Sequence, residues 1–122
     1  MQHFPKDYVL TEDGDVDQSL FILINGKLGI FKGDIQIAEF DQKGTIVGEM
    51  SVILNEPRSA TIKTLTECHI SVIKADLRGL VEKHPEIAQK LMKTLAKRLS
   101  KTTKDYWKLA EKVNYLADIN MV

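Results

Sequence analysis

The sequence predicts an α+β fold, mainly β: an antiparallel jelly roll, or double-stranded β-helix barrel, followed by one long helix. Short runs of β-type residues recur up to about residue 79, separated by turns that contain glycine. After Pro85 neither glycine nor proline occurs, and apolar residues return at alternating spacings of three and four, which is typical of a helix. The change of period divides the chain into a roll, residues 1–84, and a helix, residues 85–119. We expect both to belong to one domain.

The first part of the chain holds six candidate strands. Each is a short run rich in β-branched and aromatic residues, bounded by glycine, aspartate or asparagine. The runs are residues 8–10, 19–24, 28–31, 35–40, 59–65 and 68–73. Asn25-Gly26 separates the second run from the third, and this dipeptide is a strong hairpin signal. Short strands closed by glycine turns favour a small barrel or a jelly roll.

Composition excludes several classes of protein. The chain has 122 residues, enough to bury a core without staples. Cys68 is the only cysteine, so we expect no internal disulfide, a buried thiol and a cytoplasmic location. No apolar run of about 18 residues occurs, so we expect no membrane span. The three histidines lack the spacing of metal ligands, and we expect no metal.

Charge is zero overall but uneven along the chain. Residues 1–79 hold eight Lys or Arg against twelve Asp or Glu, so an anion bound there needs a local positive group. Segment 48–62 offers one: a glycine, a carboxylate, a short apolar turn and Arg58. Its backbone N–H groups can converge on an anion while Arg58 neutralises the charge. The acidic run at Asp13, Asp15 and Asp17 lacks the residues of a calcium loop, so we expect a solvated turn.

The long helix carries an unbroken a/d seam over four heptads, which indicates a coiled coil. The seam residues are Ala88, Met92, Leu95, Leu99, Thr102, Tyr106, Leu109, Val113 and Leu116. We expect a parallel homodimer through this seam, because a long apolar stripe would otherwise meet water. Six lysines follow one side of the same helix, at 90, 93, 97, 101, 104 and 108. A solvated outer face is the simpler interpretation of them, and contact with nucleic acid is the alternative.

The chain resembles the cyclic-nucleotide-binding domain of the catabolite-activator and cyclic-nucleotide-dependent kinase type. The resemblance rests on residues 14–15, 21–28, 48–51 and 57–61, and on the helix that begins at Pro85. Its most specific part is the phosphate-binding cassette, Gly-Glu-Met-Ser followed by Pro-Arg-Ser-Ala-Thr. The resemblance implies a regulatory sensor that binds a cyclic nucleotide in the roll and transmits its occupancy through the long helix. The family usually has a helix before its first strand, whereas here we expect only residues 1–6 there.

The resemblance implies a role for each cassette residue. Gly48 lets the backbone come close to the ligand, and the helical turn 50–54 points its N–H groups at the phosphate. Arg58 offers its planar fork to the two exocyclic phosphate oxygens. Glu49 accepts the hydrogen of the ribose 2′-hydroxyl; alternatively, it caps the short helix or pairs with Arg98. The other predicted cassette contacts are Val47, Met50, Ser51, Ser59 and Ala60.

Base recognition is implied for the long helix. By the resemblance, Thr102 reads the base in its own pocket and Thr103 reads the base in the neighbour's, so the ligand spans a dimer. Arg98 reaches the phosphate or Glu49. We expect cyclic AMP, with cyclic GMP as the alternative because Ser59 could also serve a guanine amino group.

Two other functions remain open from the sequence. One is a ligand-free structural or dimerisation domain of the same fold. The other is the sensor fragment of a transcription regulator whose DNA-binding part is absent from this chain, since no helix-turn-helix fits here. We expect no DNA binding by this chain alone. We also expect no enzyme, because cleavage of a cyclic ester needs a metal cluster or a placed acid–base pair.

Overall fold

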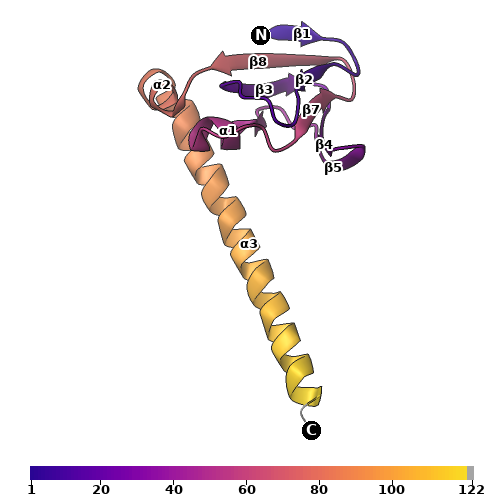
Figure 1. The fold of residues 1–122 in the computed structure, drawn as a ribbon. Coiled ribbons are helices and arrows are strands. Elements are labelled where there is room, and N and C mark those ends of the chain that lie inside the picture. The colour runs from indigo at the N-terminus through magenta and orange to yellow at the C-terminus, as the bar shows by residue number, and fades with distance from the viewer. Residues whose placement is uncertain (121–122) are drawn as a thin grey trace. The chain divides into compact units, whose positions relative to one another are not determined.

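The computed structural model describes the backbone of residues 1–120 and the side chains of residues 1–115. It divides into two compact units, Met1–Pro85 and a unit that begins at Glu86. The first unit contains eight strands and two short helices, and the second consists of the long helix α3, Pro85–Asn120 (Figure 1). Whether the two units form one domain stays a prediction.

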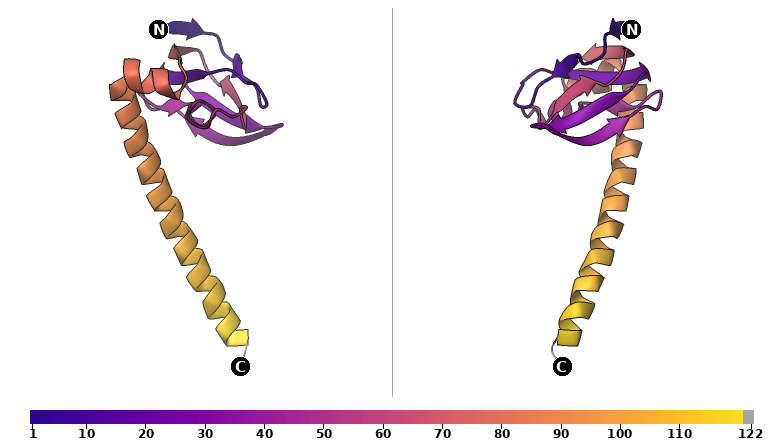
Figure 2. Two further views of the ribbon diagram at one scale, coloured as in Figure 1. Left: turned by 60° about the vertical axis from the view of Figure 1, so that its left-hand side comes forward. Right: turned by 90° about the vertical axis from the view of Figure 1, so that its right-hand side faces the viewer.

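Two antiparallel four-stranded sheets build the first unit (Figure 2). The first sheet has the order β1-β8-β3-β6, with bounds Gln2–Phe4, Cys68–Lys74, Ser19–Asn25 and Ile46–Val47. The second has the order β2-β7-β4-β5, with bounds Val9–Thr11, Thr61–Thr64, Leu28–Lys32 and Ile35–Phe40. Strands that are distant in sequence are therefore neighbours in both sheets. This topology confirms the predicted jelly roll with a long C-terminal helix.

Two strands and one helix were not expected from the sequence. β1 lies within residues 1–6, which we expected to precede the first strand, and it pairs with β8. β6 has only two residues, and α2, Leu77–Lys83, is a short helix capped by the Asp76 carboxylate, which accepts from Gly79 N–H. Runs of two or three residues are too short to show a period, so pairing with distant strands defines β1 and β6.

The Asn25-Gly26 hairpin prediction was wrong. β3 and β4 belong to different sheets, so the chain passes from one sheet to the other at this turn. Gly26 has a φ of 100°, and a Cβ there would lie 2.4 Å from the Glu67 carbonyl oxygen and 2.6 Å from Cys68 Sγ. The glycine is required by the positive φ and by the close approach of β8. A true hairpin joins β4 to β5 instead.

The core lies between the two sheets and includes residues of both. Its buried members are Phe21, Leu23, Leu28, Val47, Ile62, Cys68 and Ile70. The Cys68 thiol is fully buried and donates to the Lys27 carbonyl at 3.3 Å, as expected for a small core residue. Burial of these side chains holds β3, β6 and β7 in place, and these strands border the segment of residues 48–60 described below.

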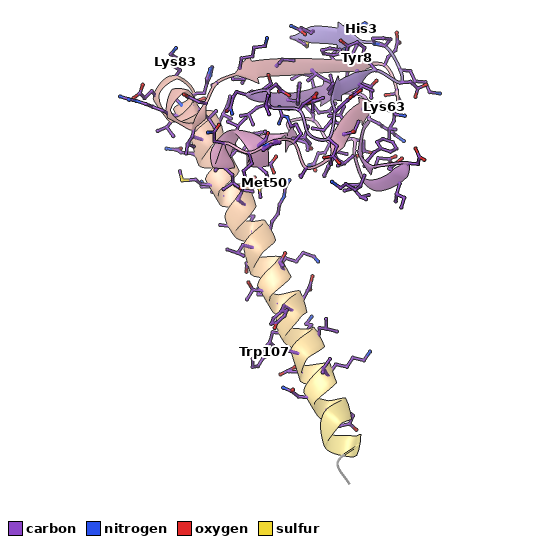
Figure 3. The ribbon with its side chains drawn as sticks, viewed as in Figure 1. His3, Tyr8, Met50, Lys63, Lys83 and Trp107 are labelled. Carbon is purple, nitrogen blue, oxygen red and sulfur yellow. The ribbon has the colours of Figure 1, made fainter. Side chains whose placement is uncertain are left out.

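The helix α3 exposes most of its described seam, whereas Ala88 and Leu95 are half-buried. Met92, Leu99, Tyr106, Leu109 and Val113 are between 56% and 72% exposed, whereas the side chain of Leu116 lies outside the described residues. Trp107 projects from the same helix (Figure 3) and is 65% exposed. Within the described chain, none of the helices combines the length and the apolar character that crossing a bilayer requires.

Candidate functional site

The short helix α1, Glu49–Leu54, lies between β6 and β7 and packs beside β3. It matches the helical turn expected at residues 50–54. Gly48 precedes it with a φ of 85°, and Asn55 ends it in the left-handed conformation. The segment after α1 then brings Arg58 back beside Gly48, within hydrogen-bonding distance of its carbonyl. A glycine before the helix and a tight turn after it thus close the loop on the arginine.

The Arg58 guanidinium is buried, with 3% of its side chain exposed. Its Nε donates to Asp17 Oδ2 at 3.2 Å. Its Nη1 donates to the Gly48 carbonyl at 2.7 Å and to Ser51 Oγ at 2.5 Å. Its Nη2 donates to Asp17 Oδ1 and to the Ser19 carbonyl, each at 2.5 Å. A guanidinium has five N–H donors, so every donor of Arg58 already has an acceptor within the protein.

Asp17 is the counter-ion of Arg58, which corrects the expectation of a purely solvated acidic turn. Its carboxylate also accepts from Thr11 Oγ1 at 2.6 Å. Partial burial would raise the pKa of Asp17, but the hydrogen bonds from Arg58 and Thr11 and the Arg58 charge outweigh it, and the pKa lies below its ordinary value. The sequence held one weak signal for this pair, an arginine in an acidic part of the chain, and the burial that makes a carboxylate partner necessary appears only in the structure.

The loop between β2 and β3 also holds the main chain around Arg58. Gly14 N–H donates to the Arg58 carbonyl at 2.8 Å, and Arg58 N–H donates to the Asp15 carbonyl at 2.7 Å. Lys32 Nζ bridges the Asp13 carboxylate, at 2.7 Å, and the Ser59 carbonyl, at 2.8 Å. Both the backbone and the side chain of Arg58 are therefore fixed by residues 13–19.

Gly48 is required by the arginine as well as by its own backbone. A Cβ at this position would lie 2.7 Å from Arg58 Nη1 and 3.2 Å from the Ser19 carbonyl oxygen. We expected the absent Cβ to make room for a ligand. In this structure the guanidinium occupies that space, and the positive φ favours glycine independently.

The remaining predicted residues fall into three groups. Glu49 and Ser51 are buried with the arginine, and Val47 belongs to the core cluster. Met50 and Ser59 are exposed, and Ala60 is half-buried. Arg98, Thr102 and Thr103 are exposed residues of α3, in the second unit. Their contacts with a ligand stay predictions.

The arrangement places a buried cation, Arg58, against main-chain carbonyls and the Ser51 hydroxyl, with its charge balanced by the Asp17 carboxylate. Glu49 begins α1 next to Gly48, and it is buried, whereas Asp17 is partly exposed. Among the residues that the structure describes, no group of three or more His, Cys, Asp or Glu side chains could hold a metal ion.

Comparison with known proteins gives a consistent result. Residues 1–84 match the model of a family described as the cyclic nucleotide-binding domain. A CRP-like cAMP-activated global transcriptional regulator of Mycobacterium tuberculosis is 29% identical over 104 residues, which cover 81% of this chain and 46% of the regulator. This chain thus spans about half the length of that curated relative.

Solved structures of similar fold include a protein with a cyclic nucleotide bound. The catabolite activator protein of Thermus thermophilus matches with a TM-score of 0.73 at 23% identity, over 89% of this chain and 54% of that one, which shows the fold. An EAL enzyme solved with cAMP bound matches with a TM-score of 0.59 at 27% identity, over 80% of this chain and 27% of that one. The same enzyme was also solved with cGMP bound.

Proposed function

Because this chain belongs to the cyclic nucleotide-binding domain family, we propose that it is a sensor that binds cyclic AMP at the cassette formed by residues 48–61. The proposal rests chiefly on one observation: a buried arginine lies against Gly48 and Ser51, at the start of α1. A curated relative is named as cAMP-activated, which favours cyclic AMP. Cyclic GMP is the alternative ligand, since a similar enzyme was solved with each nucleotide.

The bonds of Arg58 suggest where the phosphate enters. Nη1 bonds only neutral acceptors, the Gly48 carbonyl and Ser51 Oγ, whereas Nε and Nη2 both bond Asp17. A hydrogen bond becomes stronger when a charged phosphate oxygen replaces a neutral acceptor. Separating Arg58 from Asp17 would instead break charge-assisted hydrogen bonds that already exist. We therefore place the exocyclic phosphate oxygens at Nη1, while Asp17 continues to orient the guanidinium. Glu49 then takes the ribose 2′-hydroxyl.

Calorimetric titration of this chain with cyclic AMP and cyclic GMP tests the proposal. We expect saturable binding of one molecule per chain, with cyclic AMP bound more tightly. Binding of neither nucleotide would contradict the proposed function. Tighter binding of cyclic GMP would retain the sensor but reverse the choice of ligand.

The proposed output is a change in the packing of α3. Its exposed seam supports a parallel homodimer, because apolar side chains that are more than half exposed gain free energy when a second helix covers them. A ligand shifts helix arrangements only by its difference in affinity between them. We further propose that Thr102 and Thr103 contact the base and that Arg98 reaches the phosphate or Glu49.

A ligand-free structural domain is the second candidate, and the Arg58 network favours it, since all five donors are satisfied without a nucleotide. The titration above separates the two candidates. We propose that the chain binds its ligand without cleaving it and works in the cytoplasm, a reducing compartment that suits its one free cysteine. As the relative is a longer transcriptional regulator, this chain also fits the sensor part of such a protein.

A further inference from the structure

A hollow of about 350 Å³ opens in the first unit, beside the contacts of Arg58. Its apolar wall is formed by Phe4, Leu10, Phe21 and Val72, and the cassette residues 48–61 take no part in its lining. Tyr8 also lines it, with its ring centroid 5.0 Å from that of Phe4. A space of this volume with an apolar wall is large enough for a small organic molecule.

The hollow shares a wall with the arginine network. Asp17, Ser19 and Phe21 line it, and the same three residues contact the guanidinium. Asp17 is its ion-pair partner, the Ser19 carbonyl accepts from Nη2, and the Phe21 ring centroid lies 5.5 Å from Cζ. Asp17 is 39% exposed while Arg58 is 3% exposed, so the carboxylate remains accessible and the guanidinium does not.

The polar lining determines the charge of the occupant. Two carboxylates, Asp15 and Asp17 in the loop before β3, and one ammonium, Lys74 at the end of β8, line the hollow. Arg58 balances the charge of Asp17 but does not line the hollow, so the carboxylate is the nearer end of that ion pair, and a cation gains more there than an anion does. The aromatic rings of Phe4, Tyr8 and Phe21 favour a ligand with an aromatic body.

We propose that this hollow is a second binding site, for a small organic cation that carries an aromatic ring. Its ammonium pairs with Asp17 and Asp15, and its ring packs against Phe4 and Phe21. A positive charge beside Asp17 offsets part of the negative charge that faces Arg58. Occupancy therefore favours an anion at Nη1 and raises the affinity for the cyclic nucleotide, and by linkage the nucleotide raises the affinity for the cation. This coupling rests on the proposed function, whereas binding of the cation does not.

Three probes separate charge from ring: tryptamine, its neutral analogue tryptophol, and n-butylamine. In NMR titrations of the whole chain we expect tryptamine to bind most tightly and to shift the signals of Phe4, Tyr8 and Phe21. Equal affinity for tryptamine and tryptophol, or shifts elsewhere only, would refute a cation site. Equal affinity for tryptamine and n-butylamine would refute the aromatic preference.

Two charge variants should change the affinity for tryptamine in opposite directions. Lys74→Gln removes the opposing charge and should tighten tryptamine binding about two- to fivefold, and Asp15→Asn should weaken it by a similar factor. Both positions are exposed, so we expect both variants to fold. Unchanged affinity in both, in low salt, would overturn the site.

The coupling has its own test, calorimetry of cyclic AMP with and without saturating tryptamine. We expect tighter nucleotide binding in its presence, and an unchanged or weaker affinity would refute the coupling. Tryptamine binding is measured without any nucleotide. A failure of the nucleotide proposal would therefore leave the cation site standing, and the two failures are distinguishable.

Discussion

The buried arginine of the roll has its interaction partners within the chain, whereas the exposed apolar seam of α3 does not. Arg58 has acceptors for all its donors within one chain, and its charge is balanced by Asp17. The seam instead leaves large apolar side chains more than half exposed within the described chain. The arginine network is thus complete within one copy, whereas the exposed seam is a surface that the proposed dimer would cover.

The largest effect is expected from charges placed in the seam. Leu99→Glu together with Leu109→Glu would bury like charges between the two helices of a parallel dimer, so we expect the dissociation constant to rise more than about a hundredfold. Analytical ultracentrifugation measures this. Glutamates at Lys97 and Lys108, on the lysine side of α3, are the matched control and should leave a dimer. A wild-type chain that stays monomeric at high concentration would refute the seam as an interface.

The next largest effect is expected from the arginine. Arg58→Ala removes charge-assisted hydrogen bonds of about 1.5–3 kcal/mol each, and should weaken cyclic AMP binding about tenfold to a hundredfold or more. Calorimetry gives the dissociation constant. Lys63→Ala removes a positive charge from the Phe31 ring, outside the cassette (Figure 3), and should bind as the wild type does. If both variants retain wild-type affinity, the phosphate is bound elsewhere.

Gly48→Ala tests whether the arginine network, rather than a ligand alone, requires this glycine. The new Cβ meets Nη1 at 2.7 Å, and the φ of 85° strains an L-residue. We expect the free energy of unfolding to fall by about 1–3 kcal/mol even without nucleotide. Chemical denaturation measures it, with Gly33→Ala as control, since Gly33 also has a positive φ but open space around it. Equal losses in the two variants would show that only the backbone conformation matters.

The smallest effect concerns Asp17 and pH. Because its pKa is lowered in the folded state, Asp17 contributes stability that is fully present above its ordinary pKa of about 3.9 and is lost as pH falls through the lowered value. Asp17→Asn should cost no more than about 1 kcal/mol at neutral pH, since the carboxylate is 39% exposed and partly screened. The gap between wild type and variant should narrow below pH 4 in denaturation curves. A gap that does not depend on pH would show that the ion pair contributes nothing.

Long periodic segments were predictable from the sequence, and contacts between distant residues were not. The helix that begins at Pro85 and the strands β3 to β5 follow from local periodicity. β1 and β6 were not predicted, because pairing with β8 and β3 rather than residue composition makes these segments strands. The Asn25-Gly26 dipeptide led to a wrong hairpin prediction, because a turn between two sheets can require a glycine of positive φ just as a hairpin turn does.

At the candidate site too, local sequence patterns were predictable and contacts between distant residues were not. The cassette pattern predicted the family, which the match of residues 1–84 to the family model confirmed, and it singled out Gly48 and Arg58, whose ligand contacts stay predictions. It did not identify Asp17, which lies 41 residues from Arg58 and looks like one of several acids in a turn. Only the folded roll shows which of those acids meets the guanidinium.

The most direct measurement of the central claim follows the Arg58 side-chain N–H signals by ¹⁵N NMR while cyclic AMP is added. We expect the Nη1 signals to shift as the phosphate replaces the Gly48 and Ser51 acceptors, and the Nε signal to change little because Asp17 remains bonded. Guanidinium signals that stay unchanged at saturating nucleotide would contradict it.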